Sequence, residues 1–117
     1  MHGLVNINYE AMLRLVIETD QQQQQSIDAI INTTFKGYLG LPKHLITMFG
    51  LHPVPQDPDE TAPNTYYKAT VIWGHETRNI PVTLVEGEPV VGMSLLQGYS
   101  LQIQVTQHGL VTVNQIR

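Results

Sequence analysis

The stretch Ile30-Ile31-Asn32-Thr33-Thr34-Phe35-Lys36-Gly37-Tyr38-Leu39 governs how the rest of the chain is interpreted. Its two isoleucines end an apolar run that begins at Ile27, and β-branched residues in such a run are typical of a strand. The polar residues Asn32, Thr33 and Thr34 follow at once, and an apolar segment begins again at Phe35. By itself, this pattern predicts an ordinary polar turn after a buried strand.

Composition limits what the chain can be. It has 117 residues, of which 42% are hydrophobic and 14% charged, so we expect one compact domain over residues 1–117. The net charge of −4 and the lack of a Lys/Arg cluster argue against nucleic-acid binding. No apolar run approaches the ~20 residues of a membrane span, and the N-terminus does not have the pattern of a secretory signal. The absence of cysteine excludes disulfides and favours a cytoplasmic protein.

Short runs of alternating apolar residues dominate the chain and predict an all-β fold. About eight strands are expected, at residues 5–7, 12–18, 27–31, 66–73, 79–85, 100–106 and 110–116, and within the apolar run 90–96. Turns are predicted at residues 74–76, 86–89 and 108–109, and a solvated loop at the glutamines 21–25. One helix is expected at residues 42–49, since Pro42 suits a first helical turn and Gly50 suits a terminator. These elements favour a closed or nearly closed small barrel with one or two short helices.

Four segments resemble, in the same order and with similar spacing, the retroviral-type (clan AA) aspartic proteases, and in particular a small prokaryotic branch of that clan. The family's catalytic strand ends in Asp-Thr-Gly, or in Asp-Thr followed by another small residue. The matching segments are Asn32-Thr33-Thr34, Phe35-Lys36-Gly37-Tyr38-Leu39-Gly40-Leu41-Pro42, Trp73-Gly74-His75 and Val90-Val91-Gly92-Met93-Ser94-Leu95-Leu96. Together they extend over nearly the whole chain.

The resemblance implies a barrel of the retroviral aspartic protease type and a homodimer, because one chain supplies one catalytic loop and the site forms across a two-fold axis. It implies that Asn32, Thr33 and Thr34 occupy the catalytic loop, and that the segment 90–96 supports this loop from behind and starts a short helix. It also implies a peptide or protein substrate, and neither a cofactor nor a metal. The terminal segments 4–7 and 110–116 are apolar enough to interleave between two subunits, as they do in the family.

Asn32 stands where the family has its catalytic aspartate, and this departure removes the chemistry. Aspartic proteolysis needs two carboxylates that share one proton, so that one acts as base and the other as acid. An amide exchanges no proton at accessible pH, so we expect the fold to survive and the activity to be lost. Asp28 lies about 13 Å away along a strand and is not expected to substitute. Thr34 is a milder departure from the family's glycine, because a β-branched residue resists positive φ.

Several alternatives stay open at this point. Asn32 is either an engineered Asp→Asn change or a natural one, which would make the chain a pseudoprotease. The main rival function is a non-catalytic dimeric module that binds peptides or serves as a scaffold, and a third option is a dimer with a different chain that carries a true aspartate. The segment 52–64 stands where the family has its flap, but it is rich in proline and acidic residues. The five histidines show no metal-ligand spacing and are interpreted as turn or surface residues.

Overall fold

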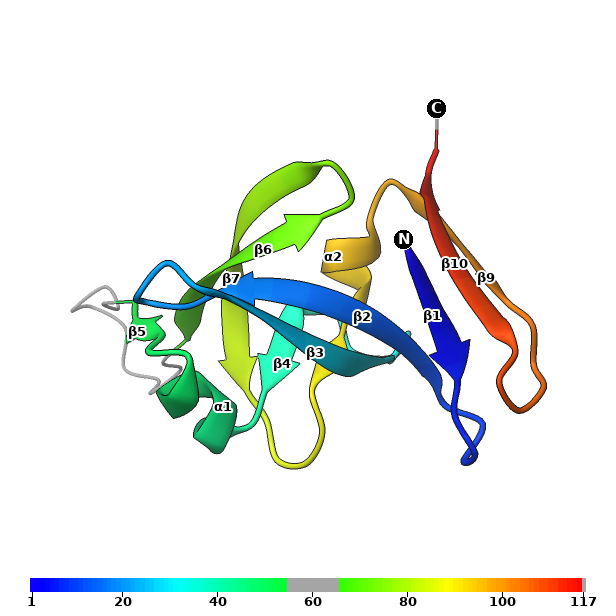
Figure 1. Ribbon diagram of the computed structural model, residues 1–117, viewed down its shortest axis with the longest axis horizontal. Coiled ribbons are helices and arrows are strands. Elements are labelled where there is room, and N and C mark those ends of the chain that lie inside the picture. Colours follow the sequence, from blue (N-terminus) through cyan, green and yellow to red (C-terminus); the bar gives the residue numbers. More distant parts are fainter. Residues whose placement is uncertain (55–65, 117) are drawn as a thin grey trace.

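The computed structural model describes residues 1–54 and 66–116, and these fold almost entirely as strands (Figure 1). The described part contains ten strands and two short helices. In chain order they are β1 (His2–Val5), β2 (Ala11–Glu18), β3 (Gln24–Ile31), β4 (Leu39–Leu41), α1 (Lys43–Met48), β5 (His52–Pro53), β6 (Tyr67–Trp73), β7 (Glu76–Leu84), β8 (Val90–Val91), α2 (Met93–Leu96), β9 (Tyr99–Ile103) and β10 (Leu110–Gln115).

Six of the strands form a closed ring. The pairing runs from β6 through β7, β4, β8 and β3 to β2, and β2 pairs back with β6 at Val16–Ile72, Ile17–Val71 and Glu18–Thr70. The short strand β8 lies between β3, to which it is parallel, and β4, to which it is antiparallel. This insertion places the residue after β3 beside the residue after β8, which positions the candidate site.

The three terminal strands extend this ring into a second, smaller sheet. The first half of β2 pairs with β1 at Gly3–Leu13, and β1 in turn pairs with β10 at Gly3–Val111. Strand β10 then pairs with β9, which is the last strand in the sheet order. In Figure 1 these three strands stand together on the right, at the end of the molecule opposite α1.

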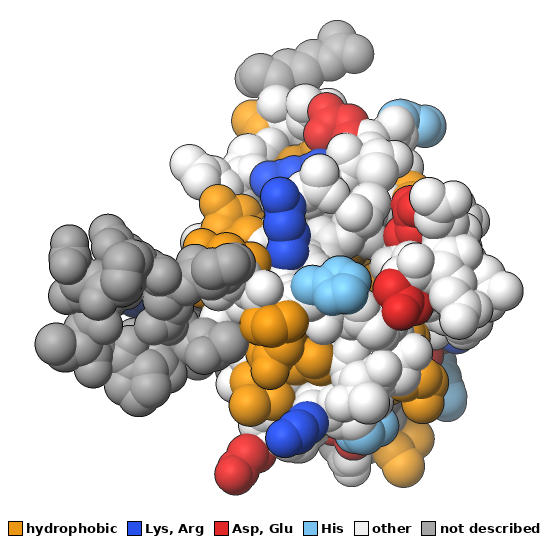
Figure 2. Space-filling view, turned by 90° about the vertical axis from the view of Figure 1, so that its left-hand side faces the viewer, with side chains coloured by type: hydrophobic (Ala, Val, Ile, Leu, Met, Phe, Trp, Pro, Cys, Tyr) orange, Lys and Arg blue, Asp and Glu red, His pale blue; other side chains and the backbone are white. Residues whose placement is uncertain are grey.

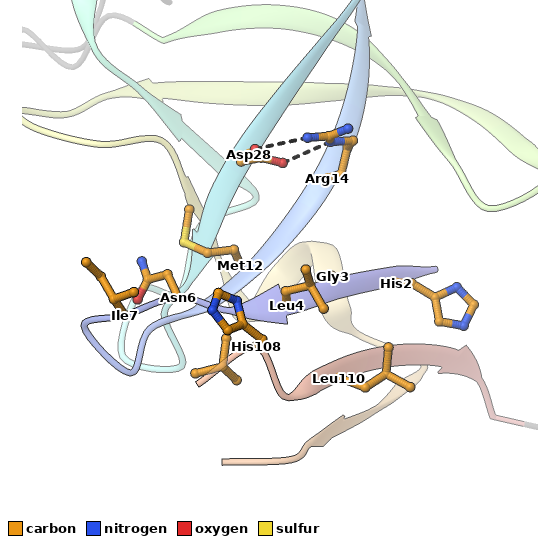
Figure 3. Close-up of a pocket in the computed structure, with 11 residues that line it drawn as sticks. His2, Gly3, Leu4, Asn6, Ile7, Met12, Arg14, Asp28, His108 and Leu110 are labelled. Atoms are coloured by element: carbon orange, nitrogen blue, oxygen red, sulfur yellow. Dashed lines mark hydrogen bonds and ion pairs between the residues drawn. The ribbon is translucent and has the colours of Figure 1, made fainter. Parts of the chain in front are cut away.

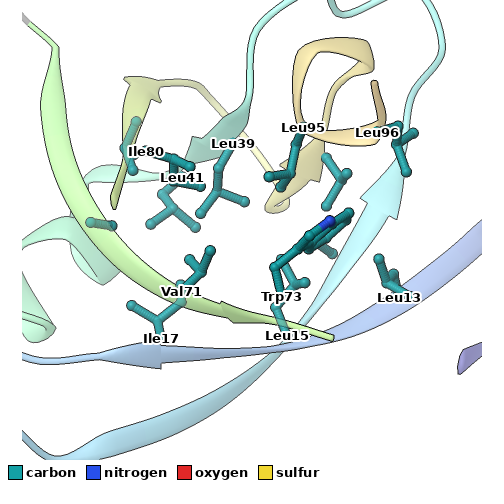
Figure 4. Close-up of a cluster of buried hydrophobic side chains, with 14 of the residues drawn as sticks. Leu13, Leu15, Ile17, Leu39, Leu41, Val71, Trp73, Ile80, Leu95 and Leu96 are labelled. Atoms are coloured by element: carbon teal, nitrogen blue, oxygen red, sulfur yellow. The ribbon is translucent and has the colours of Figure 1, made fainter. Parts of the chain in front are cut away.

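The hydrophobic core fills the ring. In the longer strands β2, β6 and β7, alternate residues are buried in the core, as the two-residue period of a strand requires. Figure 4 shows these side chains around Trp73, which is fully buried and has its ring 5.6 Å from that of Tyr99 in an edge-to-face arrangement at 77°. The largest fully buried side chains besides Trp73 are Leu13, Leu15, Ile17, Leu39, Leu41, Ile80 and Leu95.

The predicted fold class is confirmed: the chain is an all-β closed barrel with two short helices. The predicted helix at 42–49 corresponds to α1, with Pro42 and Phe49 as its flanking caps and Gly50 just beyond it at φ +66°. The hairpin turn at Gly74-His75 and the turn at His108-Gly109 are also found where they were expected.

Some strand boundaries were wrong, and the local hydrogen bonds give the reasons. The expected strand at 5–7 lies instead at His2–Val5, because the Asn6 side chain accepts hydrogen bonds from the N–H groups of Asn8 and Glu10 at 2.9 Å and closes a turn. The glutamine loop is shorter than predicted, because Gln24 pairs with Glu18 and so starts β3.

The number of strands was underestimated, because β4 and β5 have only three and two residues. Within the segment 52–64, His52–Pro53 forms β5 against β6, whereas residues 55–65 lie outside the described part, so the expectation of a surface loop or flap there is not addressed. Neither described helix has the length or the apolar character needed to cross a membrane.

Candidate functional site

The loop that follows β3 begins at Asn32 and is fixed at its first residue. The backbone N–H of Asn32 donates to the carbonyl of Val91 at 3.0 Å, which continues the parallel pairing of β3 with β8. The N–H of Phe35 then donates to the carbonyl of Asn32 at 3.1 Å, so residues 32–35 form a tight turn. Asn32 is half-buried, whereas Thr33 and Thr34 are exposed.

The side chain of Asn32 is held in one orientation by Thr34. Its Oδ1 accepts a hydrogen bond from the Thr34 N–H at 2.9 Å and a second from the Thr34 hydroxyl at 2.6 Å. A backbone N–H only donates, so it requires the oxygen of the amide and not its nitrogen on this side. Asparagine commonly bonds the N–H two residues later in this way. The structure therefore brings two of the three predicted site residues together.

The amide nitrogen of Asn32 is the atom left for a ligand. Because Oδ1 is taken by Thr34, the planar amide presents its Nδ2 hydrogens on the other side, and Nδ2 has no partner among the described residues. An aspartate in the same position would present an acceptor oxygen there. The Asn32 side chain can thus donate hydrogen bonds to a peptide carbonyl or a carboxylate, but it cannot remove a proton from water.

The rear of the loop is supported by α2 and the residue before it. The N–H groups of Gly92, Met93 and Ser94 donate to the carbonyls of Tyr38, Phe35 and Gly37 at 2.9, 2.8 and 3.1 Å. The Ser94 hydroxyl donates in addition to the carbonyl of Lys36. These bonds satisfy successive carbonyls of a loop that has no strand partner of its own, and we name residues 92–94 the loop brace.

Glycine at position 92 allows the loop and the brace to approach each other. A Cβ at Gly92 would lie 2.1 Å from the Gly37 carbonyl oxygen and 2.7 Å from that of Phe35. Both are backbone atoms, so the loop itself would have to move. The sequence-based expectation that segment 90–96 packs behind the loop and starts a helix agrees with this arrangement.

Thr33, the third predicted residue, has no part in the hydrogen bonds between Asn32 and Thr34. It lines a hollow of about 350 Å³ together with residues of the neighbouring strands and turns, which we name the loop hollow. Its other lining residues are Val5, Tyr9, Glu10, Ala11, Ile30, Ile31, Ile103 and Val105. Tyr9 and Val105 are 61% and 69% exposed, so an apolar surface extends from the candidate loop to the end of β9.

A larger groove of about 650 Å³ lies on the outer face of the terminal strands (Figure 3). Leu4, Met12 and Leu110 contribute apolar side chains to it, and Arg14 and Asp28 form an ion pair at its edge with a distance of 3.1 Å from Nε to Oδ1. The hydrogen bond from Arg14 to Asp28, together with the negative charge of Asp28, raises the pKa of Arg14 above its ordinary value. Asp28 is therefore engaged with Arg14, and the expectation that it does not act in place of a catalytic aspartate stays a prediction.

Other kinds of site find little support in the described residues. All five histidines are exposed, and no group of three or more His, Asp or Glu side chains within residues 1–54 and 66–116 has the arrangement of a metal site. On the face drawn in Figure 2, basic, acidic and apolar side chains are interspersed, and the basic ones do not form a continuous surface.

Sequence reasoning missed the role of Ser94. It considered this serine only as a nucleophile, whereas its hydroxyl and N–H both hold the loop. The available signal was its position two residues after Gly92, in the first turn of a helix that the resemblance had already placed behind the loop.

Comparisons with known proteins bear on the fold. No family model matches the sequence, and no curated protein matches it. The crystal structure of a retropepsin-like aspartic protease from Rickettsia conorii is similar to this chain with a TM-score of 0.64 and 17% sequence identity, over 98% of this chain and 89% of that one. The chain therefore has the retropepsin-like fold, as the resemblance implied.

Proposed function

We propose that this chain is a retroviral-like aspartic endopeptidase domain that acts as a homodimer and is inactive because Asn32 replaces the catalytic aspartate. Residues 1–117 would form one domain that supplies half of a two-fold site, and a cytoplasmic location fits its lack of cysteine. The observation that carries the proposal is the position of Asn32: it directly follows β3, bonds to Val91, and is supported from behind by the loop brace.

The chemistry of this site explains the predicted loss of activity. In a two-fold dimer two Asn32 amides would meet, and each would present Nδ2 hydrogens because Thr34 occupies Oδ1. Neither amide can take a proton from water, and neither can give one to a leaving group. What remains is a pair of hydrogen-bond donors, which suits binding of an extended peptide through its carbonyl oxygens.

The decisive experiment restores the carboxylate. Asn32→Asp conserves the size of the side chain, and its Oδ1 can accept the same two bonds from Thr34. We expect the variant to cleave an unfolded protein between pH 4 and 7, where a carboxylate pair shares one proton, and the unmodified chain to leave it intact. Asn32→Ser, which keeps a turn-forming side chain but adds no carboxylate, is the matched control and should be inactive.

The alternative is a non-catalytic dimeric module that binds peptides or serves as a scaffold. The identity of residue 32 favours it, because an Asn32 amide whose Oδ1 is held by Thr34 offers a ligand only the hydrogen-bond donors of Nδ2. An Asn32→Asp variant that is folded but does not cleave, at any pH in that range, would support the scaffold against the protease. A dimer with a different chain that carries the aspartate would be recognised by pull-down of a partner whose addition brings cleavage.

A further inference from the structure

The terminal strands of this chain are already paired within a single copy. Strand β1 has β2 on one edge and β10 on the other, and β10 lies between β1 and β9. The N-terminal amine donates to the Val113 carbonyl at 2.9 Å, and the Val5 N–H donates to Gly109 at 2.9 Å, so the β1–β10 pairing extends over the whole of β1. Neither strand has an edge left for a partner subunit, so the expected interleaving of the two termini would require this pairing to open.

Among the described residues, the terminal sheet has an open strand edge at β9. The N–H of Gln104 donates to the carbonyl of Leu110, and the N–H of Ile116 donates to the carbonyl of Gly98. These two bonds determine which backbone groups of β9 point towards β10. Since these groups alternate along an antiparallel strand, the N–H and C=O groups of Tyr99, Leu101 and Ile103 face away from β10. In the described part of the chain β9 has no strand neighbour on that side, and we name it the open edge.

The open edge lacks the features that normally keep strand edges apart. Native proteins protect exposed edges with lysines, prolines or bulges. The segment 90–116 contains no Asp, Glu, Lys, Arg or Pro, and the register of β9 with β10 is regular over Tyr99–Ile103. Two copies of this chain can therefore approach along β9 without like-charge repulsion, although the whole chain carries a net charge of −4.

The open edge is also continuous with the candidate site. Ile103 at the end of β9 and Val105 beyond it line the loop hollow beside Thr33. An antiparallel pair of β9 strands is self-complementary, as a two-fold interface requires. A second copy seated on this edge thus places its own Ile103, and with it its own loop hollow, against the same interface.

We infer that two copies of this chain associate edge to edge through β9, in the order β10-β9-β9-β10, without exchanging their terminal strands. The inference rests on the proposed function only in requiring a two-fold site, and it specifies the partner surface. It makes β10 the strand that completes the terminal sheet within each copy, so that the apolar segments 4–7 and 110–116 serve the subunit itself.

The first test places like charges along the open edge. Ser100 and Gln102 are exposed on one face of β9, so Ser100→Lys/Gln102→Lys sets lysines of the two copies against each other, and opposed like charges destabilise a strand pair. We expect self-association, measured by analytical ultracentrifugation, to weaken about tenfold or more. Ser100→Glu/Gln102→Glu should weaken it similarly, and an equimolar mixture of the two variants should recover the dimer. Thr77→Lys, exposed on β7, is the control and should dimerise normally.

The second test separates this arrangement from strand exchange. His2 and Thr112 face each other across β1 and β10, and the chain has no cysteine, so His2→Cys/Thr112→Cys adds the only two thiols. Oxidation should give a crosslink within one chain, seen as a monomer in denaturing gels without reductant. Covalent dimers in those gels, a chain that is monomeric at all concentrations, or lysine variants that dimerise normally would each overturn the inference.

These outcomes are independent of the proposed function. Cleavage by Asn32→Asp together with crosslinked dimers would keep the protease and reject the β9 edge. An inactive Asn32→Asp variant whose dimers follow the charge pattern would do the reverse.

Discussion

At the level of single residues, the proposed loss of proteolytic activity rests on one atom of residue 32. Asparagine and aspartate have nearly the same shape, and both can accept the two hydrogen bonds that Thr34 donates to Oδ1. The other terminal atom of the side chain, Nδ2 in asparagine and Oδ2 in aspartate, decides the chemistry. An amide nitrogen donates hydrogen bonds, whereas a carboxylate oxygen accepts a proton. Under the proposed function, folding and proteolysis therefore make separable demands on position 32.

Thr34 should contribute to stability through its hydroxyl. Thr34→Val keeps the shape of the side chain and removes the bond to Asn32 Oδ1, so we expect a loss of about 0.5–1 kcal/mol in the free energy of unfolding. Urea denaturation at a concentration that keeps the chain monomeric measures this loss. Thr33→Val, which removes a hydroxyl without a partner in the described residues, should leave the monomer's stability unchanged. Equal losses for both variants would contradict the assignment.

Trp73 is fully buried, and its indole N–H has no hydrogen-bond partner in the described part of the chain. Trp73→Ala should cost about 3–5 kcal/mol through loss of packing. Trp73→Phe should cost clearly less, because it keeps an aromatic ring against Tyr99 and removes a buried donor whose desolvation costs about 1–3 kcal/mol. Thermal and urea unfolding compare the two variants, and a phenylalanine variant as unstable as the alanine one would be the contrary result.

At the level of strands and helices, the candidate loop depends on segments distant in sequence. Strand β8 fixes the start of the loop, and the loop brace at residues 92–94 holds its carbonyls. These hydrogen bonds and the absence of a side chain at Gly92 fix the conformation of the loop. A site of this kind is sensitive to changes behind it as well as within it.

Gly92→Ala should therefore displace the loop. Its Cβ would meet two backbone oxygens, and we expect a loss of more than about 2 kcal/mol in stability together with loss of any cleavage gained by Asn32→Asp. Gly87→Ala is the matched control: Gly87 has φ +92°, but a Cβ added there would meet nothing within 4 Å, so it should cost about 1–2 kcal/mol and leave cleavage intact. Unfolding curves and the cleavage assay in the Asn32→Asp background provide the measurements.

The molecule as a whole consists of a closed ring and a three-stranded terminal sheet that share β2. The ring closes through β2 and β6. Within residues 1–54 and 66–116, the terminal sheet is joined to the ring by strand pairing only where β1 meets β2. Trp73 of β6 and Tyr99 of β9 make an aromatic contact between the two parts. The terminal sheet thus depends on β1 for its continuous hydrogen bonding to the ring.

Deletion of residues 1–5 should make the terminal sheet much less stable than the ring. Without β1, the hairpin β9–β10 has no strand connecting it to β2, and an isolated hairpin is marginally stable in water. Amide hydrogen exchange should show loss of protection in β9 and β10, while β2, β3, β6 and β7 stay protected. Uniform loss of protection throughout the chain would show instead that ring and terminal sheet fold as one unit.

Local patterns were sufficient for much of the fold. Residues 67–84 predicted their hairpin because alternating β-branched and aromatic residues flank Gly74-His75, and Pro42 and Gly50 marked both ends of α1. The boundaries failed where polar residues belong to strands, as at Gln24, or where a side chain such as that of Asn6 closes a turn. The alternation of apolar residues predicts neither the start of β3 at Gln24 nor the turn at Asn6, because both depend on hydrogen bonds and not on hydropathy.

Residue identity and local spacing were enough to predict an all-β barrel and to show that position 32 carries an amide. They could not reveal that Thr34 fixes this amide, that Ser94 supports the loop from 58 residues away, or that the termini pair within one chain; these follow from the folded arrangement alone. The difference is one of range. Hydropathy and turn preference act between neighbours in sequence, whereas the Ser94 contact and the pairing of the termini join segments that come close only after the ring has closed.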